Sequence, residues 1–106
     1  MVRSIFLARI HFTDESGSKL RPILLIKKNS YGDYLFFPLT SNVKSEGVLI
    51  DNNNIEKGYL PKQSKIIIEK IGIIAPDLLI KRVAIINQNT FNSVLDHFIN
   101  FFKSKK

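Results

Sequence analysis

The spacing of apolar residues constrains this chain more than any other feature of its sequence. As far as residue 86, Ile, Val, Leu and Phe occur in short runs that are separated by residues typical of turns. Such runs of branched and aromatic residues predict β-strands. From residue 89 onward the apolar residues recur every three or four positions, which predicts an amphipathic helix. We therefore expect a mostly β fold that ends in one helix.

The limits of the expected strands follow from the Pro and Gly residues between the runs. Pro22 has no backbone N–H, so the second strand begins there or has an edge there. The continuous apolar run of 64–74 is typical of a strand that is buried on both faces. We expect strands over 4–12, 21–28, 34–40, 47–50, 64–74 and 82–86, loops over 13–20 and 51–58, and a hairpin turn over 29–34.

The last part of the chain is expected to be helical in two places. Pro76 fits the first turn of a short helical segment, where its missing N–H costs nothing. Asn89 or Thr90 is expected to cap the helix over 89–106. The whole chain, residues 1–106, is long enough for one domain with a real core. We expect a small, mostly antiparallel barrel or sandwich of five to seven strands, closed by the C-terminal helix.

The composition excludes several classes of protein. The absence of cysteine excludes a disulfide framework, a thiolate nucleophile and a cysteine-based zinc site. The two histidines lie far apart in the sequence, so we expect no metal site and no cofactor. The longest apolar runs are far short of the ~20 residues that span a bilayer. The first residues also lack the small-residue cleavage site of a signal peptide. We expect a soluble, cytoplasmic protein.

The charge balance favours a polyanionic partner. There are 16 basic and 9 acidic residues, which gives a net charge of +7. A basic domain attracts nucleic acid, because its cationic side chains release the counterions that are condensed on the phosphates. Removing Lys103, Lys105 and Lys106, which fit a solubilising tail, leaves +4. The charge permits a nucleic-acid partner but does not specify one.

Two polar pairs lie where an expected strand meets a loop, namely Arg21-Pro22 and Thr40-Ser41. Loops on a rigid scaffold often carry the groups that contact a ligand. The simpler alternatives are an ion pair of Arg21 with Asp14 or Glu15, and a turn that is capped by the Thr40 side chain.

The segments around these pairs resemble the MazF/PemK family of type II toxins. The resemblance rests on "FTDESGSKLRPILLI", "FFPLTSN", "GYLPKQSKI" and a helix after "IKRVAII", and it covers nearly the whole chain. It implies an SH3-like barrel of the CcdB/PemK-like toxin fold with appended helices, and a homodimer. It also implies an endoribonuclease that cleaves single-stranded mRNA without metal. The products would be 2′,3′-cyclic phosphate and 5′-OH ends, and a cognate antitoxin would block the reaction.

The resemblance also implies a set of catalytic residues. Arg21 matches the motif arginine and would stabilise charge on the phosphate, to which a guanidinium offers a fork of donors. Thr40 matches the threonine at the end of the third strand and would add a hydroxyl donor. PemK-type members carry an Arg-x-Asp pair on the strand that here reads "KIIIEKI", where this chain has Ile67 and Glu69. Glu69 is thus the candidate for a general base.

Two further departures from the family concern the N-terminal part of the chain. Many members begin the first strand with Gly-Asp or Gly-Glu, where this chain has Arg3-Ser4. A first-loop histidine of some members is replaced by Asp14. The chain's own His11 and His97 have no partner that the sequence identifies, so we assign them no role.

Other polar residues in the expected loops are candidates for RNA binding. Lysines there would follow the RNA backbone, and tyrosines would stack on bases, since the chain has no Trp. The stripe Phe91–Phe102 fits a core or a dimer surface better than a platform for bases. The RNA-binding candidates are Lys19, Ser41, Asn42, Lys44, Lys62 and Lys65.

Two other functions remain open from the sequence. A CcdB-like gyrase poison shares the barrel, but that type depends on a C-terminal Trp and a terminal apolar pair, whereas this chain ends "FKSKK". The other is a catalytically inactive, SH3-like RNA-binding or protein-binding module. The presence of Ile67 in place of the family's arginine favours this inactive module, and the presence of Arg21 together with Thr40 argues against it.

Overall fold

The computed structural model describes residues 1–11 and 18–105 of the chain. Within this part, every strand pairing is antiparallel. The strands are β1 (Ser4–His11), β2 (Ser18–Lys28), β3 (Tyr34–Thr40), β4 (Val48–Ile50), β5 (Ile55–Gly58), β6 (Ser64–Ile66), β7 (Gly72–Ile74) and β8 (Leu79–Ile86). The α-helix is α1 (Gln88–Lys103), and short 3₁₀ turns are η1 (Asn52–Asn54), η2 (Ile68–Lys70) and η3 (Pro76–Leu78).

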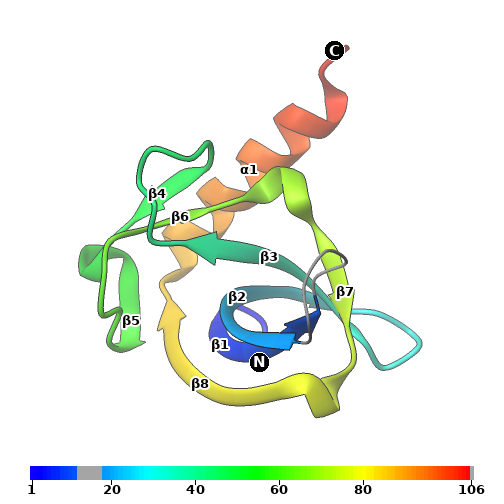
Figure 1. The fold of residues 1–106 in the computed structure, drawn as a ribbon. Coiled ribbons are helices and arrows are strands. Elements are labelled where there is room, and N and C mark those ends of the chain that lie inside the picture. Colours follow the sequence, from blue (N-terminus) through cyan, green and yellow to red (C-terminus); the bar gives the residue numbers. More distant parts are fainter. Residues whose placement is uncertain (12–17, 106) are drawn as a thin grey trace.

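The strands form one strongly curled sheet. Its order is β4-β6-β3-β2-β1-β8-β5, and β7 pairs with β3 outside this path. Figure 1 shows the sheet curling around β1 and β2 as a half-barrel, with α1 extending from the end of β8. The prediction of a mostly β, barrel-like fold with a C-terminal helix is confirmed. The number of strands is eight and not five to seven.

Both faces of the central strands are buried, which explains their continuous apolar runs. On β2, Leu24 packs into one cluster, and its neighbours Ile23 and Leu25 pack into the other. This alternation is the period of two that any strand imposes. Phe91 and Val94 of α1 belong to the cluster that contains Leu24. The helix therefore covers one face of the sheet.

The prediction of one strand over 64–74 is wrong, because Pro38 interrupts the edge of β3. Ile67 N–H donates to the carbonyl of Pro38 at 2.8 Å. Pro38 has no N–H to return, so a continuing strand would leave a carbonyl unpaired. The chain instead turns through η2 and rejoins β3 at Gly72, the first residue of β7.

Pro22 marks an edge of β2 and is not its first residue. β2 begins at Ser18 and pairs with β1 along its first half. Its pairing with β3 ends at Ile23, so the residues before Ile23 are joined to β1 alone. The predicted loop over 13–20 thus ends earlier, and residues 12–17 lie outside the described part of the chain. The predicted hairpin turn is confirmed, since Asn29 N–H donates to the carbonyl of Asp33 at 2.8 Å.

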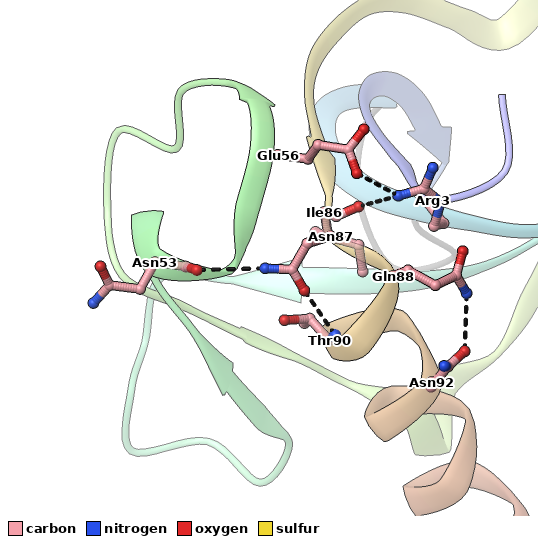
Figure 2. A network of polar contacts seen from close by, with 8 residues as sticks. All are labelled: Arg3, Asn53, Glu56, Ile86, Asn87, Gln88, Thr90 and Asn92. Atoms are coloured by element: carbon pink, nitrogen blue, oxygen red, sulfur yellow. Dashed lines mark hydrogen bonds and ion pairs between the residues drawn. The ribbon is translucent and has the colours of Figure 1, made fainter.

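The helix begins earlier than predicted, because β8 passes directly into it. Asn87 is the cap, and its Oδ1 accepts a hydrogen bond from Thr90 N–H at 2.8 Å (Figure 2). Neither Asn89 nor Thr90 has this role. The short helical segment expected at Pro76 is confirmed as η3. Among the described residues, no helix is long and apolar enough to cross a membrane.

Candidate active site

Arg21 and Thr40 line the same two clefts. The pairing of β2 with β3 ends where Ile23 lies opposite Pro38, so Arg21 and Thr40 lie beyond the last paired residues of these two strands. On the other side of β3, Thr40 lies opposite Lys65 of β6. Residues directly opposite in neighbouring strands share a face and lie about 5 Å apart. A guanidinium and a hydroxyl thus border the same clefts, and an ammonium group belongs to the residue opposite the hydroxyl.

The two clefts meet at Arg21, Leu39 and Thr40, which line both of them. We name them the Lys62 cleft and the Lys70 cleft. The Lys62 cleft, of about 300 Å³, is further lined by Ile5, Leu7, Pro22, Ser41, Leu60, Pro61, Lys62, Ser64 and Val83. The Lys70 cleft, of about 340 Å³, is further lined by Ile10, Ile23, Phe36, Pro38, Ile67 and Lys70. None of these described lining residues is acidic, so both clefts favour an anion.

The Thr40 side chain shapes the loop that follows β3. Its Oγ1 accepts a hydrogen bond from Asn42 N–H at 3.1 Å, and Asn42 Oδ1 accepts one from Lys44 N–H at 3.1 Å. The turn capping considered as an alternative role for Thr40 is therefore present. It does not exclude a second role, because a hydroxyl that accepts one bond can still donate its own proton.

Arg21 is exposed near the start of β2 and takes part in an interaction within the protein. Asp14 and Glu15, considered as its ion-pair partners, lie outside the described residues. Arg21 lies three residues inside β2 and not at its boundary with a loop, and it lines both clefts.

Glu69 lies in a separate cleft. This Glu69 cleft, of about 430 Å³, does not include Arg21 or Thr40. It is lined by Ser45, Glu46, Gly47, Val48, Ile67, Ile68, Glu69, Lys70 and His97. His97 Nδ1 is 2.8 Å from the carbonyl oxygen of Ser93, to which it donates when protonated there. The structure thus brings together Arg21 and Thr40 but not Glu69.

The predicted RNA-binding residues surround the two clefts to different degrees. Ser41 and Lys62 line the Lys62 cleft, and Lys65 lies opposite Thr40. Asn42 and Lys44 are exposed in the loop after β3. Lys19 is exposed on β2 opposite Ile10, a residue of the Lys70 cleft.

Sequence reasoning missed Lys70, which lines the Lys70 cleft together with Arg21 and Thr40. The sequence predicts one strand over 64–74. In a strand, the neighbours Glu69 and Lys70 point to opposite faces, so this prediction gives Lys70 no role at the site. The η2 turn that Pro38 imposes changes the direction of this side chain. The sequence feature that could have indicated this turn is Pro38, which lies within the neighbouring strand.

The Asn-rich segment braces the wall of the Lys62 cleft. Asn52 Nδ2 donates to the carbonyl of Leu60 at 2.9 Å, and Asn52 Oδ1 accepts from Leu60 N–H at 2.8 Å. Leu60 is buried, and Pro61 and Lys62 follow it into the cleft. The predicted loop over 51–58 is therefore wrong in part, since it forms η1 and β5 and holds Lys62 in place.

Arg3 has the backbone conformation that glycine adopts most easily. Its φ is +75°, in the left-handed region where a Cβ is unfavourable. Its Nη1 donates to the carbonyl of Ile86 at 2.9 Å and to Glu56 Oε1 at 3.0 Å (Figure 2).

Among the residues that the structure describes, no three His, Asp or Glu side chains are grouped as metal ligands. Comparison with known proteins gave one family. The model of the PemK-like, MazF-like toxin of type II toxin–antitoxin systems matches residues 3–102. No curated protein matched the chain. The match covers nearly all of the 106 residues and agrees with the curled sheet, so the chain belongs to the PemK-like, MazF-like family of type II toxins.

Proposed function

We propose that this toxin is a cytoplasmic endoribonuclease that cleaves single-stranded mRNA without a metal ion. The observation that carries the proposal is the shared position of Arg21 and Thr40 at the junction of two clefts without acidic lining. A phosphate at this junction would meet a guanidinium and a hydroxyl, and Lys65 lies opposite Thr40 on β6.

The reaction would begin with attack of the RNA 2′-OH on its own phosphorus. The 2′-O–P bond forms and the P–O5′ bond breaks, which leaves a 2′,3′-cyclic phosphate and a 5′-OH. A base takes the proton of the 2′-OH, and an acid supplies one to O5′. Negative charge grows on the equatorial phosphate oxygens, where Arg21 and Thr40 would donate hydrogen bonds. One preorganised donor of this kind is typically worth about 10² to 10³ in rate.

Arg21 would act through charge and not as a proton carrier, because arginine remains protonated in proteins. Glu69 is the general base that the resemblance implies. Since it lines the neighbouring cleft, its carboxylate would act only on RNA that also enters the Glu69 cleft. Glu69→Gln tests this role. A loss of about 10² or more in rate supports it, since general-base catalysis is worth about 10² to 10⁴, and an unchanged rate excludes it.

Membership of a type II family implies a cognate antitoxin. We further propose that the toxin is a homodimer. Several large apolar side chains are exposed, among them Ile73 at 62% and Phe102 at 77%. A two-fold contact is the commonest way to cover such surface. Sedimentation at micromolar concentration should give a dimer, and a monomer under these conditions contradicts this part of the proposal.

The experiment is cleavage of a mixed mRNA by the purified protein in EDTA. Cleavage should occur without divalent ions, and Arg21→Ala should reduce its rate about 10²- to 10³-fold while the melting temperature stays nearly unchanged. Activity that requires added magnesium overturns the mechanism. Absence of cleavage under every condition supports the inactive binding module, and gyrase inhibition without cleavage supports the CcdB-like alternative.

A further inference from the structure

Lys70 provides a second positive charge in the cleft that begins at Arg21 and Thr40. It is exposed, and it is the only lysine among the described residues that line the Lys70 cleft. The only ion pair among the described residues joins Arg3 and Glu56, so Lys70 is not tied to Glu46 or Glu69. Its ammonium group therefore remains available to an anion.

The η2 turn explains why Lys70 reaches this cleft while Glu69 does not. Lys70 N–H donates to the carbonyl of Ile67 at 3.2 Å. In a 3₁₀ turn, side chains three residues apart lie on the same side. Ile67 and Lys70 accordingly both line the Lys70 cleft, and Glu69, between them, does not, although all three residues line the Glu69 cleft. Lys70 thus brings a cation to the cleft that Ile67 also lines.

The two clefts that share Arg21 and Thr40 carry different lysines. Lys62 lines only the Lys62 cleft, and Lys70 lines the Lys70 cleft but not the Lys62 cleft. Each cleft has about 300 Å³ or slightly more, the lower end of the roughly 300–1,000 Å³ of typical ligand sites. One nucleotide on each side of the central phosphate matches this arrangement.

We propose that Lys70 is a phosphate-binding residue and that the RNA strand passes through both clefts. One phosphate lies at Arg21 and Thr40, a second at Lys62, and a third at Lys70 on the opposite side. The inference rests on the proposed RNA substrate. It extends that proposal by giving the strand a path and by assigning a contact that neither the sequence nor the family match supplies.

The first test measures binding of a fluorescently labelled, single-stranded RNA of mixed sequence that carries 2′-O-methyl groups and cannot be cleaved. Each phosphate contact contributes about 0.7 to the slope of log affinity against log salt for single strands. Between about 50 and 200 mM salt, Lys70→Ala should lower this slope by about 0.7. It should also weaken binding about three- to tenfold at the lower salt, and Lys70→Arg should bind like the wild type.

The matched control is Lys27→Ala, which removes an exposed lysine at the far end of β2. Lys27 lies six residues beyond Arg21, about 20 Å along the strand. This variant should bind RNA with the wild-type slope. Equal slopes for wild type, Lys70→Ala and Lys27→Ala, with all three folded by thermal melting, overturn the inference.

A second test determines which phosphate of the RNA each lysine contacts. In an uncleavable oligonucleotide that contains the cleavage motif, one phosphate at a time is replaced by a neutral methylphosphonate. Lys62→Ala and Lys70→Ala should each become insensitive to one replacement, and the two positions should lie on opposite sides of the cleaved bond. Insensitivity at the same position in both variants, or at none, overturns the inference.

The outcomes also separate this inference from the proposed function. Wild-type cleavage with unchanged binding by Lys70→Ala removes the inference and leaves the endoribonuclease. Binding that depends on Lys70 without any cleavage keeps the inference and removes the endoribonuclease. A wild-type protein that binds no single-stranded RNA contradicts both.

Discussion

At the scale of single residues, Arg3 shows how this chain accommodates a non-glycine residue in a glycine-like conformation. A left-handed backbone costs a residue with a Cβ about 1–2 kcal/mol. The Arg3 side chain offsets this cost through its bonds to the carbonyl of Ile86 and to Glu56. The ion pair is partly exposed and contributes at most about 1 kcal/mol, so the bond to the carbonyl matters at least as much.

Two substitutions at this position separate the backbone effect from the side-chain effect. Arg3→Ala loses both bonds and keeps the unfavourable φ, so it should lower the free energy of unfolding by about 1–3 kcal/mol. Arg3→Gly loses the same bonds but removes the backbone strain. It should be about 1 kcal/mol more stable than Arg3→Ala in urea unfolding. Equal stabilities of the two variants contradict a strained Arg3.

At the scale of elements, the sequence predicted what depends on local patterns and missed what depends on a neighbouring strand. The short strands, the hairpin turn at Asn29 and the amphipathic α1 all follow from local spacing and turn residues. The break at η2 does not, because residues 64–74 are equally apolar on both sides of it. It depends on Pro38, a residue of the strand that they pair with.

The residues of the candidate site fall into the same two groups, those that local patterns predict and those whose position depends on a neighbouring strand. Arg21 and Thr40 are predicted together because each lies in a recognisable motif, and in the structure both line the same two clefts. The prediction places Glu69 and Lys70 on an unbroken strand, whereas in the structure Lys70 lines both the Lys70 cleft and the Glu69 cleft, and Glu69 lines only the second. Lys70 was therefore not among the predicted RNA contacts.

The return of the chain to β3 depends on Gly72. A Cβ at this residue would lie 2.7 Å from Cζ of Phe36, a ring that is only 9% exposed. The ring is packed in a core cluster and has little room to move, so Gly72→Ala should destabilise the protein by about 1–3 kcal/mol. In a Phe36→Leu background the same change should cost clearly less, as measured by thermal or urea unfolding. An equal cost in both backgrounds contradicts this contact.

At the scale of the whole molecule, the net charge of +7 is compatible with the proposed RNA substrate. The family implies an antitoxin, and we infer that its inhibitory segment is acidic and folds on binding. Such a segment would occupy the same basic clefts as RNA. Charges at a surface are screened beyond about 8–10 Å at physiological salt, so both complexes should weaken as salt rises.

RNA and the antitoxin are therefore expected to compete for binding. Titration of the cognate antitoxin against a labelled uncleavable RNA should displace the RNA completely, and Lys62→Ala should weaken both complexes. Simultaneous binding without mutual loss of affinity places the antitoxin away from Arg21 and Thr40.

The central claim is that the RNA's own 2′-OH is the nucleophile, held at the junction of Arg21 and Thr40. The most direct measurement uses an RNA oligonucleotide with a single 2′-deoxy nucleotide immediately 5′ of the mapped cleavage site, incubated with the protein in EDTA. We predict that this one change abolishes cleavage at that bond, while the all-ribose RNA yields a 2′,3′-cyclic phosphate and a 5′-OH. Cleavage of the deoxy-substituted bond, or a 5′-phosphate on the product, contradicts the account.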